Sequence, residues 1–257
     1  MSQRDCMMLA VRAGEVLLQN GAEIARVEDT IGRILDAFHV SDHHIYVISN
    51  GIFVTASENS QEPFYAVRHI AYTQMNLSRI VQVNALAREI VAVQGECNVA
   101  DYATAIEECS KSKVNPFWLQ LLACALGAGG FAYILGGTVQ DSAAAFCAGL
   151  ALKSFQSFGI RHANPYITCI LSSALVTLAS AILCRLGLGT SLDHIIIGAI
   201  MPLVPGVVMT TAIRSLFNAD FLSGGIHLTD AFLTASSIAV GVSTTLYLWN
   251  LTAGGVL

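Results

Sequence analysis

The sequence predicts a mainly α-helical membrane protein, in which a cytosolic α+β domain (residues 1–115) precedes a transmembrane domain of five helices (residues 116–257). Two observations favour this fold class. Only eight of the Asp, Glu, Lys and Arg residues follow Asn115, and they leave five apolar stretches of about 20 residues, the length that crosses a bilayer. The first 115 residues instead show the helix and strand patterns of an ordinary soluble domain.

The five apolar stretches are expected to be membrane-spanning helices. We place them at about 117–137, 142–160, 166–184, 195–213 and 231–251, with the last apolar stretch continuing to Leu257. Four of the five lack formal charge, and the second contains Lys153. A soluble core could bury one helix that is hydrophobic on every face, but five in succession would expose too much apolar surface.

The distribution of charge excludes some partners and suggests an orientation. Residues 1–115 hold 14 acidic and nine basic side chains, and no basic stripe indicates nucleic acid. Met1–Asn20 contains acids and lacks the apolar core of a signal peptide, so we expect the first domain to stay in the cytosol. Five crossings then place the C-terminus outside. The excess of basic residues on the cytosolic side agrees, with Arg185 alone outside and five basic residues inside: Lys111, Lys113, Lys153, Arg161 and Arg214.

Helical periodicity and turn residues predict the elements of the first domain. A first helix ends at Asn20–Gly21, and an amphipathic helix follows over 24–38. Strands are expected at 45–49, 52–56 and 64–70. The first two should form a hairpin whose type I′ turn is Asn50–Gly51.

Two more helices complete this domain. Asn76 is expected to cap a helix that ends near Gly95, and a short helix should run from Val99 to about Ser110. The buried face of the longer helix is expected to contain Ile80, Val83, Ala87 and Ile90.

Nothing in the sequence favours catalysis or a cofactor. His39, Asp42, His43 and His44 could bind a metal or move protons, but we interpret them as a solvated loop between a helix and a strand. No GxSxG, phosphate-loop, GxGxxG or HExxH motif occurs, so we expect no enzyme, no nucleotide hydrolysis, no metal and no cofactor. The seven cysteines show no CxxC spacing, and we expect them to be reduced: Cys6, Cys97, Cys109, Cys124, Cys147, Cys169 and Cys184.

The fourth apolar stretch contains the segment Pro202–Gly206, whose two prolines and glycine should kink or split the helix. Irregular backbone inside a bilayer is tolerated when it is buried in protein or faces a cavity. A half-helix N-terminus there would offer N–H groups and a positive dipole to a carboxylate. Pro202, Pro205, Gly206 and Thr210 are therefore the predicted binding residues, with the Thr210 hydroxyl as a donor. The alternative is a kink that only shapes packing.

Charged residues in or near the spans are costly to bury, so each is interpreted separately. Lys153 either pairs with a substrate carboxylate or extends to the headgroups, and Arg214 is a second candidate carboxylate partner. Asp141 and Asp193 are interpreted as helix caps.

Loop and packing residues are interpreted structurally. A cytosolic link of caps and turns is expected to contain Asp220, Ser223, Gly224 and Asp230. Dense glycine and alanine in the first two spans predicts close helix packing, within the chain or in a homo-oligomer.

Several segments together resemble the threonine/serine exporter family, in particular the YjjP-type larger subunits of its two-component branch. The resemblance covers nearly the whole chain, and the segments that carry it are Gly21–Glu23 with Arg26–Glu28, Pro116–Trp118, Pro202–Gly206 and Ala212–Arg214 continuing to Leu222–Gly224.

This resemblance implies an export permease in the bacterial inner membrane. It also implies a partner chain, a small YjjB-type membrane subunit, because fused members carry a second membrane half. The substrates associated with the family are threonine and serine, and for the two-component branch also succinate, all of which carry a carboxylate. A membrane-tethered hydrolase and a sensor or scaffold that binds without transport are the rival classes.

Overall fold

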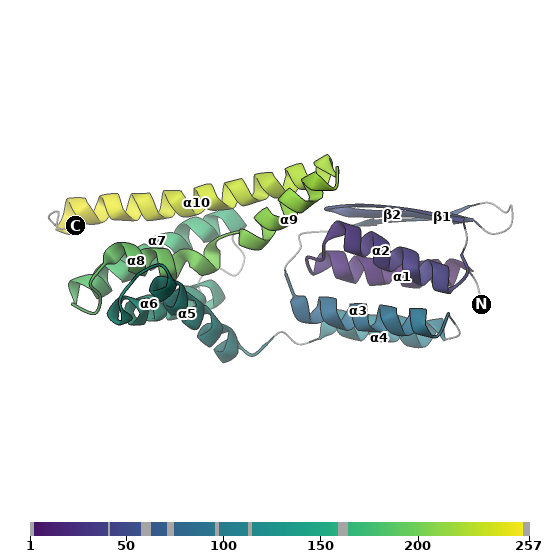
Figure 1. Cartoon of the computed structure of the whole chain (residues 1–257), viewed down its shortest axis with the longest axis horizontal. Helices are drawn as coiled ribbons and strands as arrows, with labels where there is room; N and C mark the ends of the chain where they lie inside the picture. The colour runs from purple at the N-terminus through teal and green to yellow at the C-terminus, as the bar shows by residue number, and fades with distance from the viewer. Residues whose placement is uncertain are drawn as a thin grey trace. The chain divides into compact units, whose positions relative to one another are not determined.

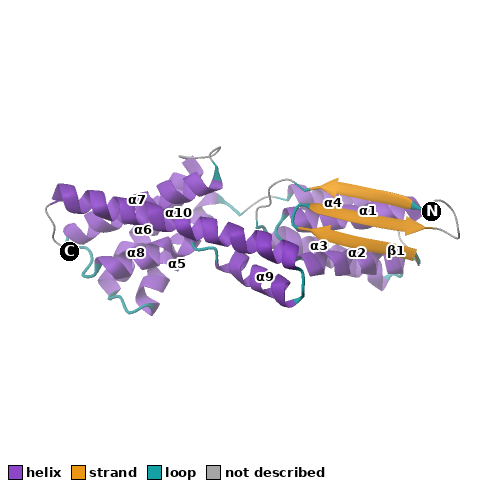
Figure 2. Cartoon of the chain, turned by 90° about the horizontal axis from the view of Figure 1, so that it is seen from above, coloured by secondary structure: helices purple, strands orange, loops and turns teal. Residues whose placement is uncertain are grey.

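The computed structural model describes residues 3–40, 42–57, 63–70, 75–95, 98–112, 115–158 and 164–253. The chain divides into two compact units, Met1–Val114 and Asn115–Leu257. Both are rich in helix, and the strands of the described residues all lie in the first unit (Figures 1 and 2). Lys113, Arg161 and Cys97 are outside the described residues, so the expectations that concern them stay predictions.

The first unit has three layers. Its elements are α1 (Gln3–Gln19), α2 (Ile24–Ala37), β1 (Asp42–Ile48), β2 (Gly51–Ser57), β3 (Phe64–His69), α3 (Leu77–Ala92) and α4 (Val99–Lys111). The antiparallel sheet β1-β2-β3 covers one side of α1 and α2, and α3 and α4 cover the other side (Figure 1). Because α1 lies between these layers, it is buried on most of its surface.

The helix predictions for this unit are confirmed. The face of α2 that periodicity assigned to the core is buried, including Val27, Ile31 and Ile34. Asn76 caps α3, since its Oδ1 accepts a hydrogen bond from the amide of Arg79 at 3.2 Å. These features were predictable because each depends on residues within one or two helical turns.

The three predicted strands and the hairpin of the first two are confirmed, but the predicted turn is wrong. Ile48 pairs with Gly51, so the connection is Ser49–Asn50, and neither Asn50 nor Gly51 has the positive φ of a type I′ turn. Gly51 also pairs with His69 on β3, and pairing on both sides keeps it extended.

The expected loop of histidines is also largely strand. Asp42, His43 and His44 belong to β1, and the His43 ring nitrogen Nδ1 lies 2.7 Å from the Val40 carbonyl oxygen. Among the described residues, no group of three or more His, Cys, Asp or Glu side chains is placed to hold a metal.

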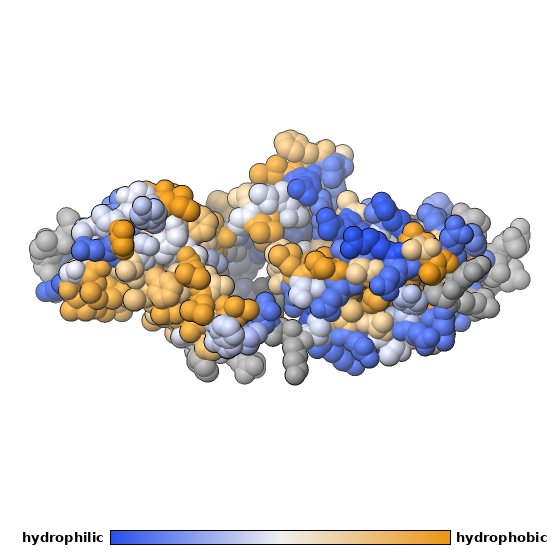
Figure 3. Space-filling model, turned by 60° about the horizontal axis from the view of Figure 1, so that its bottom comes forward, coloured by the Kyte–Doolittle hydropathy of each residue, from blue (hydrophilic) through white to orange (hydrophobic). Residues whose placement is uncertain are grey.

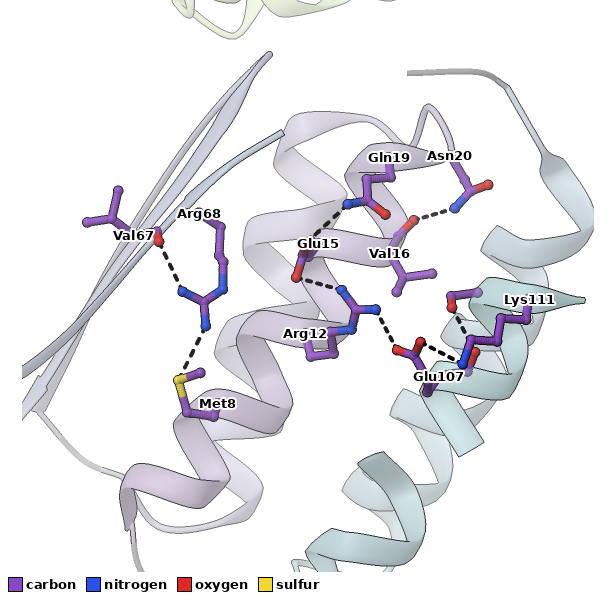
Figure 4. Close-up of polar contacts among 11 residues, drawn as sticks. Met8, Arg12, Glu15, Val16, Gln19, Asn20, Val67, Arg68, Glu107 and Lys111 are labelled. Carbon is purple, nitrogen blue, oxygen red and sulfur yellow. Dashed lines mark hydrogen bonds and ion pairs between the residues drawn. The ribbon is translucent and has the colours of Figure 1, made fainter. Parts of the chain in front are cut away.

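A charged network joins α1 to α4 (Figure 4). Arg12 forms ion pairs with Glu15 and with Glu107, and Lys111 pairs with the same Glu107 carboxylate at 3.2 Å. Hydrogen bonds from Arg12 and then from Lys111 lower the pKa of Glu107. The network therefore favours the charged carboxylate at neutral pH.

The second unit is helical throughout its described elements. They are α5 (Phe117–Ile134), α6 (Val139–Phe158), α7 (Pro165–Arg185), α8 (Leu192–Ile200), the 3-10 turn η1 (Met201–Leu203), α9 (Gly206–Phe217) and α10 (Phe221–Ala253). Three helices, α5, α7 and α10, are long and apolar enough to cross a membrane, and α8–η1 with α9 would be a fourth if the bent pair is one span. The 20-residue α6 is not among them; it carries Asp141 and Lys153.

The surface shows where apolar residues gather in each unit. On the face shown in Figure 3, broad hydrophobic areas lie over the second unit, and the most hydrophilic surface lies over the first. Several large side chains of the second unit are strongly exposed, among them Phe217 at 86% and Phe232 at 68%. Exposed aromatic residues on apolar helices are expected where lipid replaces water.

The predicted link before the last span is wrong. Residues 221–253 form one continuous helix, so Ser223, Gly224 and Asp230 are helical. Ser223 and Gly224 are buried, and a Cβ at Gly224 would lie 2.8 Å from the Leu216 side chain of α9. Close packing against α9 thus keeps a glycine inside the helix. Asp220 does cap this helix, because its Oδ1 accepts from the Ser223 amide at 3.1 Å.

Small residues bring α5 close to its neighbours within this chain. A Cβ at Gly198 of α8 would lie 2.5 Å from the Ala132 Cβ, and a Cβ at Gly149 of α6 would lie 2.9 Å from the Ala128 Cβ. Gly127 and Gly130 instead face open space. The predicted close packing is therefore confirmed for α5 with α6 and α8.

Candidate functional site

The candidate site is the break between α8 and α9. Pro202 lies in the 3-10 turn that extends α8, and Pro205 occupies the N-cap position of α9. The two helices are bent by 59° at this point. The predicted break is confirmed, and its cause is the lack of two amide hydrogens together with the bulk of two proline rings.

Local hydrogen bonds satisfy only part of the backbone in the break. The Gly206 amide donates to the Val204 carbonyl at 2.8 Å, and the Met209 amide donates to the Pro205 carbonyl at 3.0 Å. Helix geometry gives the amides of Val207 and Val208 no acceptor inside α9, and the described part of the chain supplies none. The first turn of α9 thus offers two donors and a positive dipole end.

The hydroxyl groups near the break are already engaged as donors. Thr210 and Thr211 both donate from Oγ1 to the Val207 carbonyl, at 2.9 and 2.8 Å. This differs from the expected role of Thr210 as a donor to ligand. In this arrangement the Thr210 oxygen retains lone pairs, and it would have to rotate to donate elsewhere.

Within the described part of the second unit, the break is uncovered on one side. Pro202, Gly206 and Thr210 are exposed, and a Cβ added at Gly206 would meet nothing within 4 Å. Among the described elements, the extensive contact of α9 is with α10, whereas α8 packs against α5, α6 and α7. The break therefore separates α8, which is packed among three helices, from α9, which packs mainly against α10.

The two candidate cations lie at different places relative to the break. Lys153 is half-buried on α6, and its neighbour Leu152 is fully buried in a cluster with Ala199 of α8, against which Leu203 packs. That part of α6 therefore passes beside the break. Arg214 is exposed in the last turn of α9, eight residues after the first residue of that helix, roughly 12 Å along its axis.

Sequence reasoning missed that Asp141 links the start of α6 to the start of α8 through hydrogen bonds, an arrangement called here the Asp141 clamp. Asp141 is fully buried and accepts five hydrogen bonds. The Thr138 amide donates to Oδ2 at 2.9 Å and the Asp141 amide donates to the Thr138 hydroxyl oxygen at 3.2 Å, which together form a capping box at the start of α6. The Thr138 hydroxyl also donates to Oδ2, at 2.8 Å. The Thr190 hydroxyl also donates to Oδ2, at 2.9 Å. The amides of Thr190 and Ser191, which precede α8, donate to Oδ1 at 2.6 and 2.9 Å.

The clamp fixes the start of α8 to the start of α6. The expected capping role of Asp141 is confirmed, and the Thr138-x-x-Asp141 spacing could have revealed the capping box. The bonds to Thr190 and Ser191 join residues 49 and 50 positions apart and had no local signal. Asp193, the other acid interpreted as a cap, lies in the first turn of α8 and is exposed.

Two contacts show that α7 and α10 run in the same direction. Near the start of α7, the Tyr166 hydroxyl donates to Asp230 of α10 at 2.9 Å. At the end of α7, the Arg185 guanidinium lies 5.9 Å from the centre of the Trp249 ring, 19 residues further along α10. Because α7 and α10 are parallel, α8, η1 and α9 together must return the chain to the level at which α7 begins.

Comparison with known proteins decides the family. The family model described as "Putative threonine/serine exporter" matches residues 8–249. The chain belongs to this family. The threonine/serine exporter family consists of transporters, so the chain is a multi-pass membrane protein with an export function. The predicted resemblance is confirmed.

Relatives of two lengths match the chain. "Probable succinate transporter subunit YjjP" of Escherichia coli (strain K12) is 25% identical over 254 residues, which cover 97% of this chain and 96% of the relative. "Threonine/serine exporter" of Corynebacterium glutamicum is 23% identical over 244 residues, which cover 92% of this chain and 50% of that protein. "Probable threonine/serine exporter" of Mycobacterium tuberculosis is 22% identical, with 93% and 45% covered. No solved structure matches the chain.

Proposed function

We propose that this chain is the larger subunit of a secondary exporter for small carboxylate-bearing metabolites, with threonine- and serine-like amino acids favoured. The observation that carries the proposal is the broken fourth helix. Its second half, α9, begins with amides that have no acceptor among the described residues, and it packs on α10, whereas its first half, α8, is embedded among other helices. Broken helices of this kind bind the charged groups of substrates in transporters. The names of the relatives from Corynebacterium and Mycobacterium support amino acids as substrates.

The helix directions support five crossings. The parallel course of α7 and α10 supports a bent pair that returns across the membrane, because a re-entrant loop would make these two helices antiparallel. The Asp141 clamp likewise makes α6 and α8 start at the same level. Although α6 carries Asp141 and Lys153, its 20 residues are about 30 Å long, enough to span the hydrocarbon core.

The orientation that we propose places the first unit in the cytosol of a bacterial cell and the C-terminus outside the inner membrane. Lys111 and Arg214 then lie on the cytosolic side, and Arg185 lies outside beside Trp249. An excess of Lys and Arg on the cytosolic side supports this orientation. Trp249 at the opposite end agrees with the preference of tryptophan for the membrane interface.

Substrate binding is proposed at the N-terminus of α9. A carboxylate would accept from the amides of Val207 and Val208 and would lie at the positive end of the helix dipole. Lys153 is the proposed counter-ion, because its part of α6 packs beside the break. Pro202, Pro205 and Gly206 shape the site, and Thr210 lines it; we give Arg214 a secondary role at the cytosolic end of α9.

The uncovered side of the break suggests a partner. The Escherichia relative is called a transporter subunit, and the match to the Corynebacterium exporter accounts for half of that longer protein. We propose that a separate, small YjjB-type membrane subunit covers α9 and completes the site. A second copy of this chain is the alternative occupant.

Succinate is the second candidate substrate, because the relative that aligns over nearly its whole length is called a succinate transporter subunit. Succinate and serine share one carboxylate and differ at the other end of the molecule. Succinate needs a second cationic partner, and serine needs an acceptor for its ammonium group. The fluxes of labelled serine and labelled succinate, measured separately, therefore distinguish the candidates.

Counterflow in proteoliposomes tests the proposal. Labelled serine, threonine and succinate are followed with this chain alone and with its small partner. We expect flux with both chains, and loss of most flux in Gly206→Leu, because the added side chain fills the approach to the first turn of α9. The matched control is Gly225→Leu in α10, since both glycines have open space where a Cβ would be.

The results have separate meanings. Saturable binding without flux in the presence of the partner would make the chain a sensor or scaffold. Equal flux in the two glycine variants would show that the substrate does not use the break.

A further inference from the structure

The first unit contains a pocket between α2 and α3 that the proposed transport site does not involve. Its volume is about 460 Å³, within the size range of small-molecule sites. The lining residues recur every three or four positions on both helices, so the pocket is formed by one face of each helix. Both helices contribute arginine: Arg26 and Arg33 come from α2, and Arg88 comes from α3.

The pocket is locally cationic in an acidic part of the chain. Three arginines and one acid, Asp29, line it, whereas residues 1–115 as a whole carry 14 acids and nine bases. Asp29 pairs with Arg33 through Nε at 2.9 Å, which leaves the terminal nitrogens of that guanidinium available. The excess of positive charge in the pocket therefore favours the binding of an anion.

Two of the arginines have no partner for their guanidinium groups within the described part of the chain. Neither Arg26 nor Arg88 forms an ion pair or a side-chain hydrogen bond there. By contrast, Arg12 pairs with two glutamates, and Arg79 donates to the Ser112 carbonyl at 2.9 Å. Unpaired arginines on opposite walls of one pocket can both donate hydrogen bonds to the same anionic group.

The remaining walls add hydrogen bonding and an apolar surface. Asn84 offers a side-chain amide, and the Thr30 oxygen keeps its lone pairs because its hydroxyl donates to the Arg26 carbonyl at 2.8 Å. Ala87 is buried at the base, and Val81 and Val91 are exposed at the rim. A ligand with a short carbon body between anionic groups matches these walls.

We propose that the pocket between α2 and α3 binds a small dianionic metabolite, through carboxylate or phosphate groups held by Arg26 and Arg88. Guanidinium groups bind both kinds of oxyanion in bidentate geometry, so the two share one chemistry. The site lies in the unit that precedes the membrane helices and is separate from the break at Gly206. A ligand there would report the metabolic state to the exporter or hold substrate before transport.

Binding to the full chain in nanodiscs of zwitterionic lipid tests the proposal. Isothermal titration uses succinate, inorganic phosphate and pyrophosphate as separate probes. We expect saturable binding of at least one of these three anionic probes. Arg26→Gln with Arg88→Gln should weaken it about 10- to 100-fold, the effect of losing charge-assisted hydrogen bonds. The matched control is Arg4→Gln, an exposed arginine of α1 outside the pocket, which should bind within about twofold of the wild type.

Further experiments distinguish binding in this pocket from binding at the transport site and from binding to lipid. Gly206→Leu should keep the binding, and its loss in that variant would assign the ligand to the break instead. Absence of saturable binding for all three probes overturns the proposal, as does equal binding by the double arginine variant. Binding of the wild type to vesicles containing phosphatidylglycerol, without binding of the soluble probes, would identify a lipid surface as the ligand and also overturn it.

Discussion

Replacing Asp141 by Ala should destabilise the second unit more than removal of any exposed charge. The substitution leaves three backbone amides without their acceptor, those of Thr138, Thr190 and Ser191. An unsatisfied buried amide costs about 1–2 kcal/mol, so the loss should reach about 3–6 kcal/mol. At roughly 2–4 °C per kcal/mol, Tm should fall by about 6 °C or more.

The intrinsic fluorescence of tryptophan measures this unfolding selectively. Both tryptophans of the chain, Trp118 and Trp249, lie in the second unit, so a thermal scan of the protein in detergent follows that unit alone. The matched control is Asp193→Ala, an exposed acid in the first turn of α8. It loses only a favourable helix-dipole interaction of about 1 kcal/mol or less.

An amide at position 141 provides a finer test. Asp141→Asn keeps the shape and one acceptor oxygen, so Thr190 and Ser191 remain bound while the Thr138 amide loses its partner. Its Tm should fall between those of the alanine variant and the wild type. Equal Tm values for Asp141→Ala and Asp193→Ala would refute the clamp, because the buried bonds would then contribute no more than a surface charge.

Three further predictions concern packing, pH and the counter-ion. Gly241→Ala should destabilise the protein by about 1–3 kcal/mol in the same fluorescence scan, because its Cβ would lie 2.4 Å from the Ile170 carbonyl oxygen, whereas Gly225→Ala, with open space, should be neutral or stabilising. The stability that the charged Glu107 adds is fully present above its ordinary pKa of 4.5 and is lost as pH falls through its lower folded pKa. In melts followed by circular dichroism, the Tm of Glu107→Gln should therefore fall less on acidification than the Tm of the wild type. Lys153→Gln should reduce carboxylate flux severalfold if the amine pairs with substrate; unchanged flux would mean that it only reaches the headgroups.

Features with a local cause could be predicted from the sequence. The broken helix follows from two prolines three residues apart, and the Asn76 cap follows from one side chain and an amide three residues later. The recurrence of apolar residues every three or four positions likewise predicted that Val27 and Ile31 lie in the core.

Features that depend on distant partners could not be predicted. Gly51 stays extended because His69 pairs with it, and Gly224 stays helical because Leu216 packs against it. At the candidate site, the sequence located the break but not its surroundings. Neither the bonds from Thr190 to Asp141 nor the packing of Leu152 beside the break has a signature in neighbouring residues.

The two halves of the broken helix differ in a way that suits alternating access. Alternating access often moves one group of helices against another that keeps its packing. α8 is the more firmly held half, because Asp141 holds its start and Gly198 packs closely against Ala132 near its end. α9 carries the donor amides and packs on α10, so a carboxylate bound there would act on the less anchored half. We infer that α9 and the start of α10 move during transport while α8 stays with α5 and α6, and that Asp141→Ala should therefore lower flux even at temperatures where the protein remains folded.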